Sequence, residues 1–203
     1  MKTLTKTIKA YKFEELTEDV KSTVCNRFAE IDNYSISEKI TDDFKEYLTE
    51  NASYFTDINV NWSLSNCQGD GVSFSAKVDL NKYLKLYHPK IKNSIFDALC
   101  NYVFIYSTGN TGWYAFCSLD DIQFEIDCDT DCVNFTALVN KITDGIAKKY
   151  MELCYKLEKI GYSEMEYNYS EENAKNRSKD YNIMFEADGT EIDMDDENIK
   201  IID

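Results

Sequence analysis

The stretch from Asn59 to Leu80 constrains the fold more than any other part of this chain. It reads N-V-N-W-S-L-S-N-C-Q-G-D-G-V-S-F-S-A-K-V-D-L, with apolar and polar residues alternating on both sides of a short polar break. The apolar positions are Ile58, Val60, Trp62 and Leu64 before the break and Val72, Phe74, Ala76, Val78 and Leu80 after it. Period-two alternation around a glycine-containing turn predicts a β-hairpin with one buried face. Gln68-Gly69-Asp70-Gly71 lies at the predicted tip, where Asp-Gly suits a turn that needs positive φ.

Helices and one strand are expected before the hairpin. Residues 3 to 13 predict a first strand, and Thr17 is placed to cap a helix with Glu18 and Asp19 in its first turn. The capping box Ser35-Ile36-Ser37-Glu38 predicts the start of a second helix that ends near Asn51.

Helices and strands are also mixed after the hairpin. We expect a short helix from Asn81 that His88-Pro89 interrupts, and a further helix over residues 91–99. Strands are predicted over residues 102–107, 113–118 and 122–126. The long helical repeat from Phe135 predicts a helix up to Gly161 as its C-cap, which residues 163–166 restart or continue. Ser170 caps another short helix, Tyr181 to Phe185 forms a late strand, and Asp188-Gly189 forms a turn.

Strands grouped in the middle, with helices on either side, predict an α+β fold. We expect an antiparallel sheet with helices packed mainly on one face. At 203 residues, with a single proline and 43% apolar residues, the chain suits a single domain. We place that domain at residues 1–185 and an acidic C-terminal tail at residues 186–203.

The net charge of −15 limits the partners that this protein can bind. The segment from Glu186 to Asp203 supplies eight acidic residues against Lys200, and the rest of the chain still has a net charge of −8. Such a surface repels nucleic acid phosphates. It suits solubility, a basic protein partner or the imitation of nucleic acid. No apolar run approaches the ~20 residues that span a bilayer. The N-terminus is no secretory signal, and the seven scattered cysteines are typical of reduced thiols, so we expect a cytoplasmic protein.

The sequence provides no residue set for a reaction, a metal or a cofactor. His88, the single histidine, lies beside Pro89 at a helix break, where a boundary residue is expected rather than a catalytic base. Cys128 and Cys132 have no second cysteine pair nearby for zinc. The run from Asp127 to Asp131 lacks the glycine and glutamate of a calcium loop, and no phosphate-binding loop is present. We therefore predict no catalytic residues, and no enzyme.

One stretch remains as a candidate binding site, the hairpin tip. Backbone N–H groups of the Gly-rich tip could hold a ligand beside two aromatic rings, so the candidate residues are Trp62, Gln68, Gly69, Asp70, Gly71 and Phe74. The alternative is a turn with no ligand, since Gly-rich tips are ordinary turn chemistry. The abundant aromatic residues, 14% of the chain, are expected to be buried under helices or, second, to face a protein partner.

Three motifs resemble a family of small bacteriophage and prophage proteins. Y-K-F-E-E-L-T-E-D-V-K (Tyr11 to Lys21) is similar to the family's Y-x-F-x-E-L-S/T-x-x-A-K opening. W-S-L-S-N-C-Q-G-D-G-V-S-F (Trp62 to Phe74) resembles its S-G-F-x-S-Q-G-D-G-A-S-F signature, with Leu64 in place of Gly and Cys67 in place of Ser. Y-N-I-M-F-E-A-D-G-T (Tyr181 to Thr190) is similar to its closing Y-x-F-x-x-D-G. Order and spacing match over nearly the whole chain.

Members of this family commonly carry the label "antitoxin of a toxin–antitoxin stability system". The resemblance implies a phage protein, in the cytoplasm of a bacterial host, that neutralises a host toxin or a nucleic-acid-handling defence protein, such as a CRISPR effector, by stoichiometric binding. It implies no catalytic residues. The alternative is a small-molecule binder that sequesters a nucleotide immune signal at the hairpin tip, with Lys77, Lys82, Lys85 and Lys90 as the nearest basic residues.

Overall fold

The computed structural model describes residues 6–31, 33–65, 69–92, 104–107, 122–125, 136–196 and 198–202. Over these residues the protein is a mixture of helices and small sheets, which confirms the predicted α+β class. The chain divides into two compact units: unit 1 comprises residues 1–38 and 163–203, and unit 2 comprises residues 39–162. None of the helices in the described ranges combines the length and apolar character needed to cross a bilayer.

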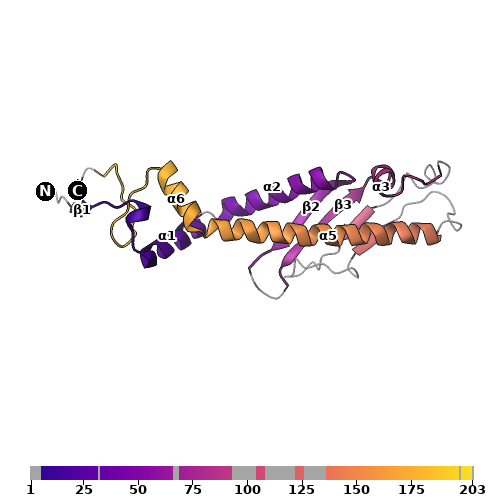
Figure 1. Cartoon of the computed structure of the whole chain (residues 1–203), viewed down its shortest axis with the longest axis horizontal. Helices are drawn as coiled ribbons and strands as arrows, with labels where there is room; N and C mark the ends of the chain where they lie inside the picture. Colours follow the sequence, from indigo (N-terminus) through magenta and orange to yellow (C-terminus); the bar gives the residue numbers. More distant parts are fainter. Residues whose placement is uncertain are drawn as a thin grey trace. The chain divides into compact units, whose positions relative to one another are not determined.

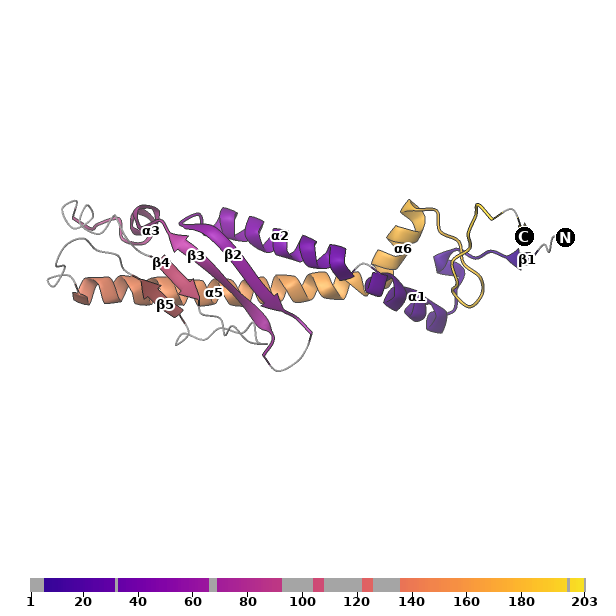
Figure 2. The same ribbon diagram turned by 180° about the vertical axis from the view of Figure 1, so that it is seen from behind.

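The predicted hairpin is confirmed and forms part of the sheet of unit 2. It consists of β2 (Phe55–Ser63) and β3 (Gly71–Val78), which are labelled in Figure 1. β4 (Phe104–Ser107) and β5 (Ile122–Glu125) follow in the order β2-β3-β4-β5 among the described strands (Figure 2). All neighbouring pairs are antiparallel, and Val60 lies opposite Phe74.

A bulge in β2 decides which of its residues face the core. The register shifts between Thr56 and Asn59, and Asp57 within this bulge has a φ of 53°. Because the bulge inserts one extra residue, Phe55 lies on the same face as Val60 although the two positions differ in parity. Phe55 is opposite Val78, so the apolar face continues across the bulge.

Helices α2 (Asn33–Asn51), α3 (Leu80–Tyr87) and α5 (Thr136–Asn168) contribute to unit 2. Phe44 of α2 packs edge-to-face on Trp62, and Tyr150 of α5 packs on Phe74. Since Trp62 and Phe74 project from the same face of the hairpin, both helices cover that face, as the opposite views of Figures 1 and 2 show. Asp79 caps α3 by accepting a hydrogen bond from the Lys82 N–H at 3.0 Å, and α3 ends before His88-Pro89 as predicted.

Gly161 is not the C-cap that the sequence suggests, because α5 continues to Asn168. A Cβ atom at this glycine would lie 2.2 Å from Leu64 Cδ1 and 2.8 Å from Phe44 Cζ. Gly161 therefore allows close packing of α5 against the end of the hairpin and α2.

Unit 1 is built from the two ends of the chain. It contains β1 (Lys6–Lys9), the 3-10 helix η1 (Phe13–Glu15), α1 (Glu18–Ile31), α6 (Glu171–Asp180) and β6 (Ile199–Ile202). β1 and β6 pair in parallel, so part of the acidic C-terminal segment lies in a sheet. The core of unit 1 consists of buried residues from both chain ends: Phe13, Leu16, Val24, Cys25, Phe28, Ala174 and Phe185.

Phe185 lies at the centre of this core. Its ring centroid is 6.4 Å from that of Phe13 and 6.2 Å from that of Phe28. The predicted strand from Tyr181 to Phe185 is wrong, because Phe185 makes only single bridges, to Tyr11 and to Glu191. The predicted first strand is likewise shorter than residues 3–13, since η1 occupies its end.

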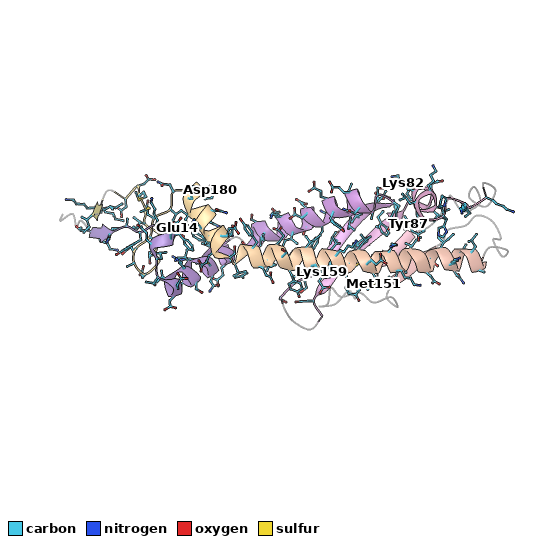
Figure 3. All side chains as sticks on the ribbon, in the orientation of Figure 1. Glu14, Lys82, Tyr87, Met151, Lys159 and Asp180 are labelled. Carbon is cyan, nitrogen blue, oxygen red and sulfur yellow. The ribbon has the colours of Figure 1, made fainter. Side chains whose placement is uncertain are left out.

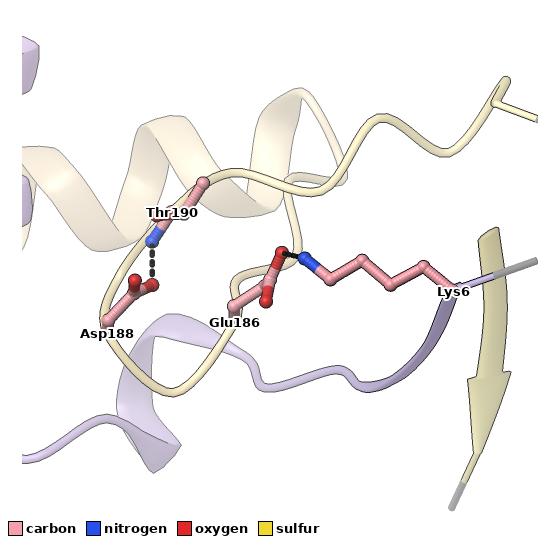
Figure 4. A network of polar contacts seen from close by, with 4 residues as sticks. All are labelled: Lys6, Glu186, Asp188 and Thr190. Carbon is pink, nitrogen blue, oxygen red and sulfur yellow. Dashed lines mark hydrogen bonds and ion pairs between the residues drawn. The ribbon is translucent and has the colours of Figure 1, made fainter. Parts of the chain in front are cut away.

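The predicted turn at Asp188-Gly189 is confirmed, and it lies in unit 1. Gly189 has a φ of 84°, and the Asp188 carboxylate accepts a hydrogen bond from the Thr190 N–H at 2.9 Å (Figure 4). Lys6 pairs with Glu186 at 2.5 Å beside this turn. The Arg27 guanidinium donates to the Gly189 carbonyl, which ties the turn to α1.

Two predicted elements fall on residues outside the described ranges. They are the helix over residues 91–99, of which only residues 91 and 92 are described, and the strand over residues 113–118.

Candidate functional site

The hairpin tip is held by one carboxylate, that of Asp70. It accepts hydrogen bonds from the Ser63 hydroxyl at 3.0 Å, the Ser65 N–H at 2.6 Å and the Ser65 hydroxyl at 3.2 Å. The Tyr162 hydroxyl of α5 donates to the same carboxylate at 3.1 Å. Bonds to an ionised acceptor are among the stronger ones in proteins. Asp70 therefore links both strands of the hairpin to α5, and its oxygens accept hydrogen bonds within the turn.

The other candidate residues of the tip differ in position. Gly69 has a φ of 100°, in the region that favours glycine, and Gly71 is buried at the start of β3. Trp62 is half-buried on β2, where its indole N–H donates to the Thr41 hydroxyl at 3.0 Å. Gln68 lies outside the described residues.

Phe74 lies in the core and is only 1% exposed. Its ring packs on those of Phe55 and Tyr150, with centroids 5.2 Å and 4.4 Å away. The Tyr150 hydroxyl donates to the Phe74 carbonyl and accepts from the Phe74 N–H, both at 2.8 Å. The structure thus brings Gly69, Asp70 and Gly71 together but buries Phe74 away from any ligand at the tip. Ligand binding at the tip itself stays a prediction.

A tyrosine cluster surrounds the end of α3. The ring of Tyr83 contacts those of Tyr54, Tyr87 and His88, with centroids 5.3, 4.8 and 6.0 Å away. Burial is the main cause that raises the pKa of Tyr83 to about 12, and it raises the pKa of Tyr54 further still. Both phenols are therefore protonated at neutral pH, and their rings pack within the cluster. An apolar cavity of about 430 Å³ adjoins the cluster, lined by Tyr87, His88, Pro89, Lys90, Ile91 and Leu138.

Among the described residues, no three His, Cys, Asp or Glu side chains gather as a metal site would require. Cys25 and Cys154 are buried thiols, and burial raises the pKa of Cys25. The acidic run at residues 127–131 and the cysteines at positions 128 and 132 lie outside the described ranges.

Charge is distributed unequally between the two units. Unit 1 holds 20 acidic and 10 basic residues, a net charge of −10 over 79 residues. Unit 2 holds 17 acidic and 12 basic residues, a net charge of −5 over 124 residues. Exposed acids occur on several elements of unit 1, with Glu14 on η1 and Asp180 at the end of α6 labelled in Figure 3. The acidity inferred for the whole protein is therefore concentrated in the unit that joins the two chain ends.

A polar groove of about 530 Å³ lies within this acidic unit. It is lined by the start of α2, the end of α5, and α6 with its C-cap residue: Ser35, Tyr167, Asn173, Asn176, Arg177, Lys179, Asp180 and Tyr181. Two of its aromatic rings face solvent, since Tyr167 is 41% exposed and Tyr181 is 76% exposed. The Arg177 guanidinium lies over the Phe28 ring, 4.6 Å from its centroid, which fixes the position of this cation.

Sequence reasoning missed this groove. Its residues come from positions 35 and 167–181, which no short-range pattern connects. The available signal was the run Lys175, Arg177 and Lys179, three basic residues in a C-terminal segment with a net negative charge.

Comparisons of this chain with protein-family models, with curated proteins and with solved structures gave no match.

Proposed function

We propose that this protein acts by stoichiometric binding to a basic protein partner. In this proposal it is a phage-encoded, antitoxin-like or counter-defence protein in the bacterial cytoplasm. Its target is a host toxin or a nucleic-acid-handling defence protein such as a CRISPR effector.

The observation that carries this proposal is the concentration of acidic charge in unit 1. Its net charge of −10 is twice that of unit 2, on a smaller number of residues. Proteins that handle nucleic acid expose basic surfaces to phosphates, and an acidic protein surface is complementary to the same sites. Complementary charge speeds association and selects partners, and salt weakens both effects.

Affinity capture from host extract tests the proposal when matched variants are included. Glu191→Gln with Asp195→Asn removes two exposed acids of unit 1, and Glu46→Gln with Glu50→Gln removes two exposed acids of unit 2. Both pairs change the net charge from −15 to −13. We expect one defined protein that wild type and the unit 2 variant retain equally, and that the unit 1 variant and high salt release.

Capture of proteins by unspecific charge attraction alone would give a different result. Many basic proteins bound equally by both variants would indicate unspecific attraction, and the absence of any defined partner at low and high salt would contradict the proposal.

A second candidate function is the sequestration of a nucleotide signal. The observation that favours it is the groove of unit 1, which combines exposed tyrosines with Arg177 and Lys179. The hairpin tip is less suited, because Phe74 is buried and Lys77 is paired with Asp57 at 2.6 Å.

A further inference from the structure

We infer that the groove of unit 1 binds a nucleoside monophosphate, an aromatic base with a single phosphate group. This inference deepens the second candidate function and is independent of the protein partner proposed above. The groove volume of about 530 Å³ falls in the range of small-molecule sites, roughly 300–1,000 Å³.

The lining of the groove matches the two parts of such a ligand. Tyr167 and Tyr181 present exposed rings on which a base can stack. Arg177 and Lys179 supply cations for the phosphate, and the amide of Asn176 offers hydrogen bonds to either part.

The position of the Arg177 side chain is fixed by contacts within the protein. Arg177 is half-buried and its guanidinium is stacked on Phe28 in the core of unit 1, so little side-chain freedom is lost on binding. The Asn173 amide is also held, because its nitrogen donates to the Asn168 carbonyl at 3.1 Å.

The charges in and around the groove limit the negative charge of the ligand that it can bind. Asp180 lines the same groove as Arg177 and Lys179, and unit 1 as a whole has a net charge of −10. A triphosphate or a polynucleotide would be repelled by the surrounding acids, whereas a monophosphate meets a small local excess of positive charge. We therefore assign the groove to monophosphates.

Calorimetric titration of the full chain with AMP, GMP, CMP and UMP tests the assignment, with ATP and adenosine as comparison probes. We expect at least one monophosphate to bind, and to bind at least tenfold more tightly than the triphosphate or the uncharged nucleoside.

Two matched pairs of variants place the binding in the groove. Lys179→Gln removes a groove cation, and Lys175→Gln removes a lysine of the same helix that pairs with Glu14 at 3.2 Å outside the groove lining. Tyr181→Ala removes a groove ring, and Tyr169→Ala removes a ring that is 43% exposed outside the lining. The groove variants are expected to weaken binding about tenfold each, the usual effect of losing one stacking or charged contact, and the control variants less than twofold.

Three results would overturn the inference. They are no heat of binding with any monophosphate at millimolar concentration, tighter binding of ATP than of AMP, or equal binding by wild type, Lys179→Gln and Tyr181→Ala. None of these results affects the capture of a protein partner through the exposed acids, so the two proposals fail separately.

Discussion

Tyr150→Phe removes one oxygen atom from the core of unit 2 and leaves the ring in place. Tyr150 is fully buried, and its hydroxyl bonds both the N–H and the carbonyl of Phe74 at 2.8 Å. The hydroxyl is thus a hydrogen-bond partner of both backbone polar groups of Phe74 in β3. Leaving a buried polar group without a partner costs about 1–3 kcal/mol, so two groups predict a loss of about 2–6 kcal/mol in unfolding free energy.

Urea denaturation measures this loss, and Tyr155→Phe is the matched control. Tyr155 lies on the same helix and is 52% exposed, so its substitution is expected to change the unfolding free energy by less than about 0.5 kcal/mol. Amide hydrogen exchange at Phe74 should also become faster in the Tyr150→Phe variant. A stability equal to that of wild type, with unchanged protection of the Phe74 amide, would refute the role given to this hydroxyl.

Three further predictions concern two closely packed glycines, Gly161 and Gly189, and the titration of Asp188. Gly161→Ala should lower the unfolding free energy by up to about 2 kcal/mol, because the contact of the new methyl group with Leu64 at 2.2 Å costs about 1–3 kcal/mol and alanine's better helix propensity offsets about 1 kcal/mol of it; a more stable variant would contradict this packing. Gly189→Ala should cost about 1–3 kcal/mol, since φ is +84° and the methyl group meets Val24 at 2.9 Å; unchanged thermal stability would contradict it. The hydrogen bond from the Thr190 N–H lowers the pKa of Asp188 in the folded state, so its contribution to stability is present above the unfolded pKa and is lost as pH falls through the folded pKa. Asp188→Ala should therefore flatten part of the loss of stability in acid, which thermal melts from pH 6 to about pH 2 can measure; an acid profile identical to that of wild type would argue against this role.

The sequence predicted those elements whose residues are neighbours in the chain. The hairpin followed from alternation at positions 58–80, and α3 from the stop at His88-Pro89. The turn at Asp188-Gly189 followed from two residues with well-known turn chemistry.

Long-range contacts explain the elements that the sequence did not predict. Gly161 resembles a helix end in the sequence, but its lack of a side chain serves contact with Leu64 and Phe44, which are more than 90 residues away in the chain. Phe185 forms no strand, since its backbone makes only single bridges to Tyr11 and Glu191, while its ring packs in the core of unit 1.

The geometry of the hairpin tip was predicted in part, and binding of a ligand there stays a prediction. The tip residues Gly69 and Asp70 lie together as expected, and the turn uses the Asp70 carboxylate. Phe74 was assigned to the tip because alternation gives a face but does not show what covers it, and Tyr150 covers it from a distance of 76 residues in the chain. Tyr150 continues the apolar stripe of α5 after Ile146, a signal that the sequence did offer.

Action through the acidic surface of unit 1 is the central claim, and association kinetics test it most directly. The association rate constant for the captured partner should be measured by stopped flow from low to high ionic strength. We expect it to fall steeply with salt, and to be lower for Glu191→Gln with Asp195→Asn than for Glu46→Gln with Glu50→Gln at the lowest salt. A rate constant that does not change with salt, or that both variants reduce equally, would contradict the claim.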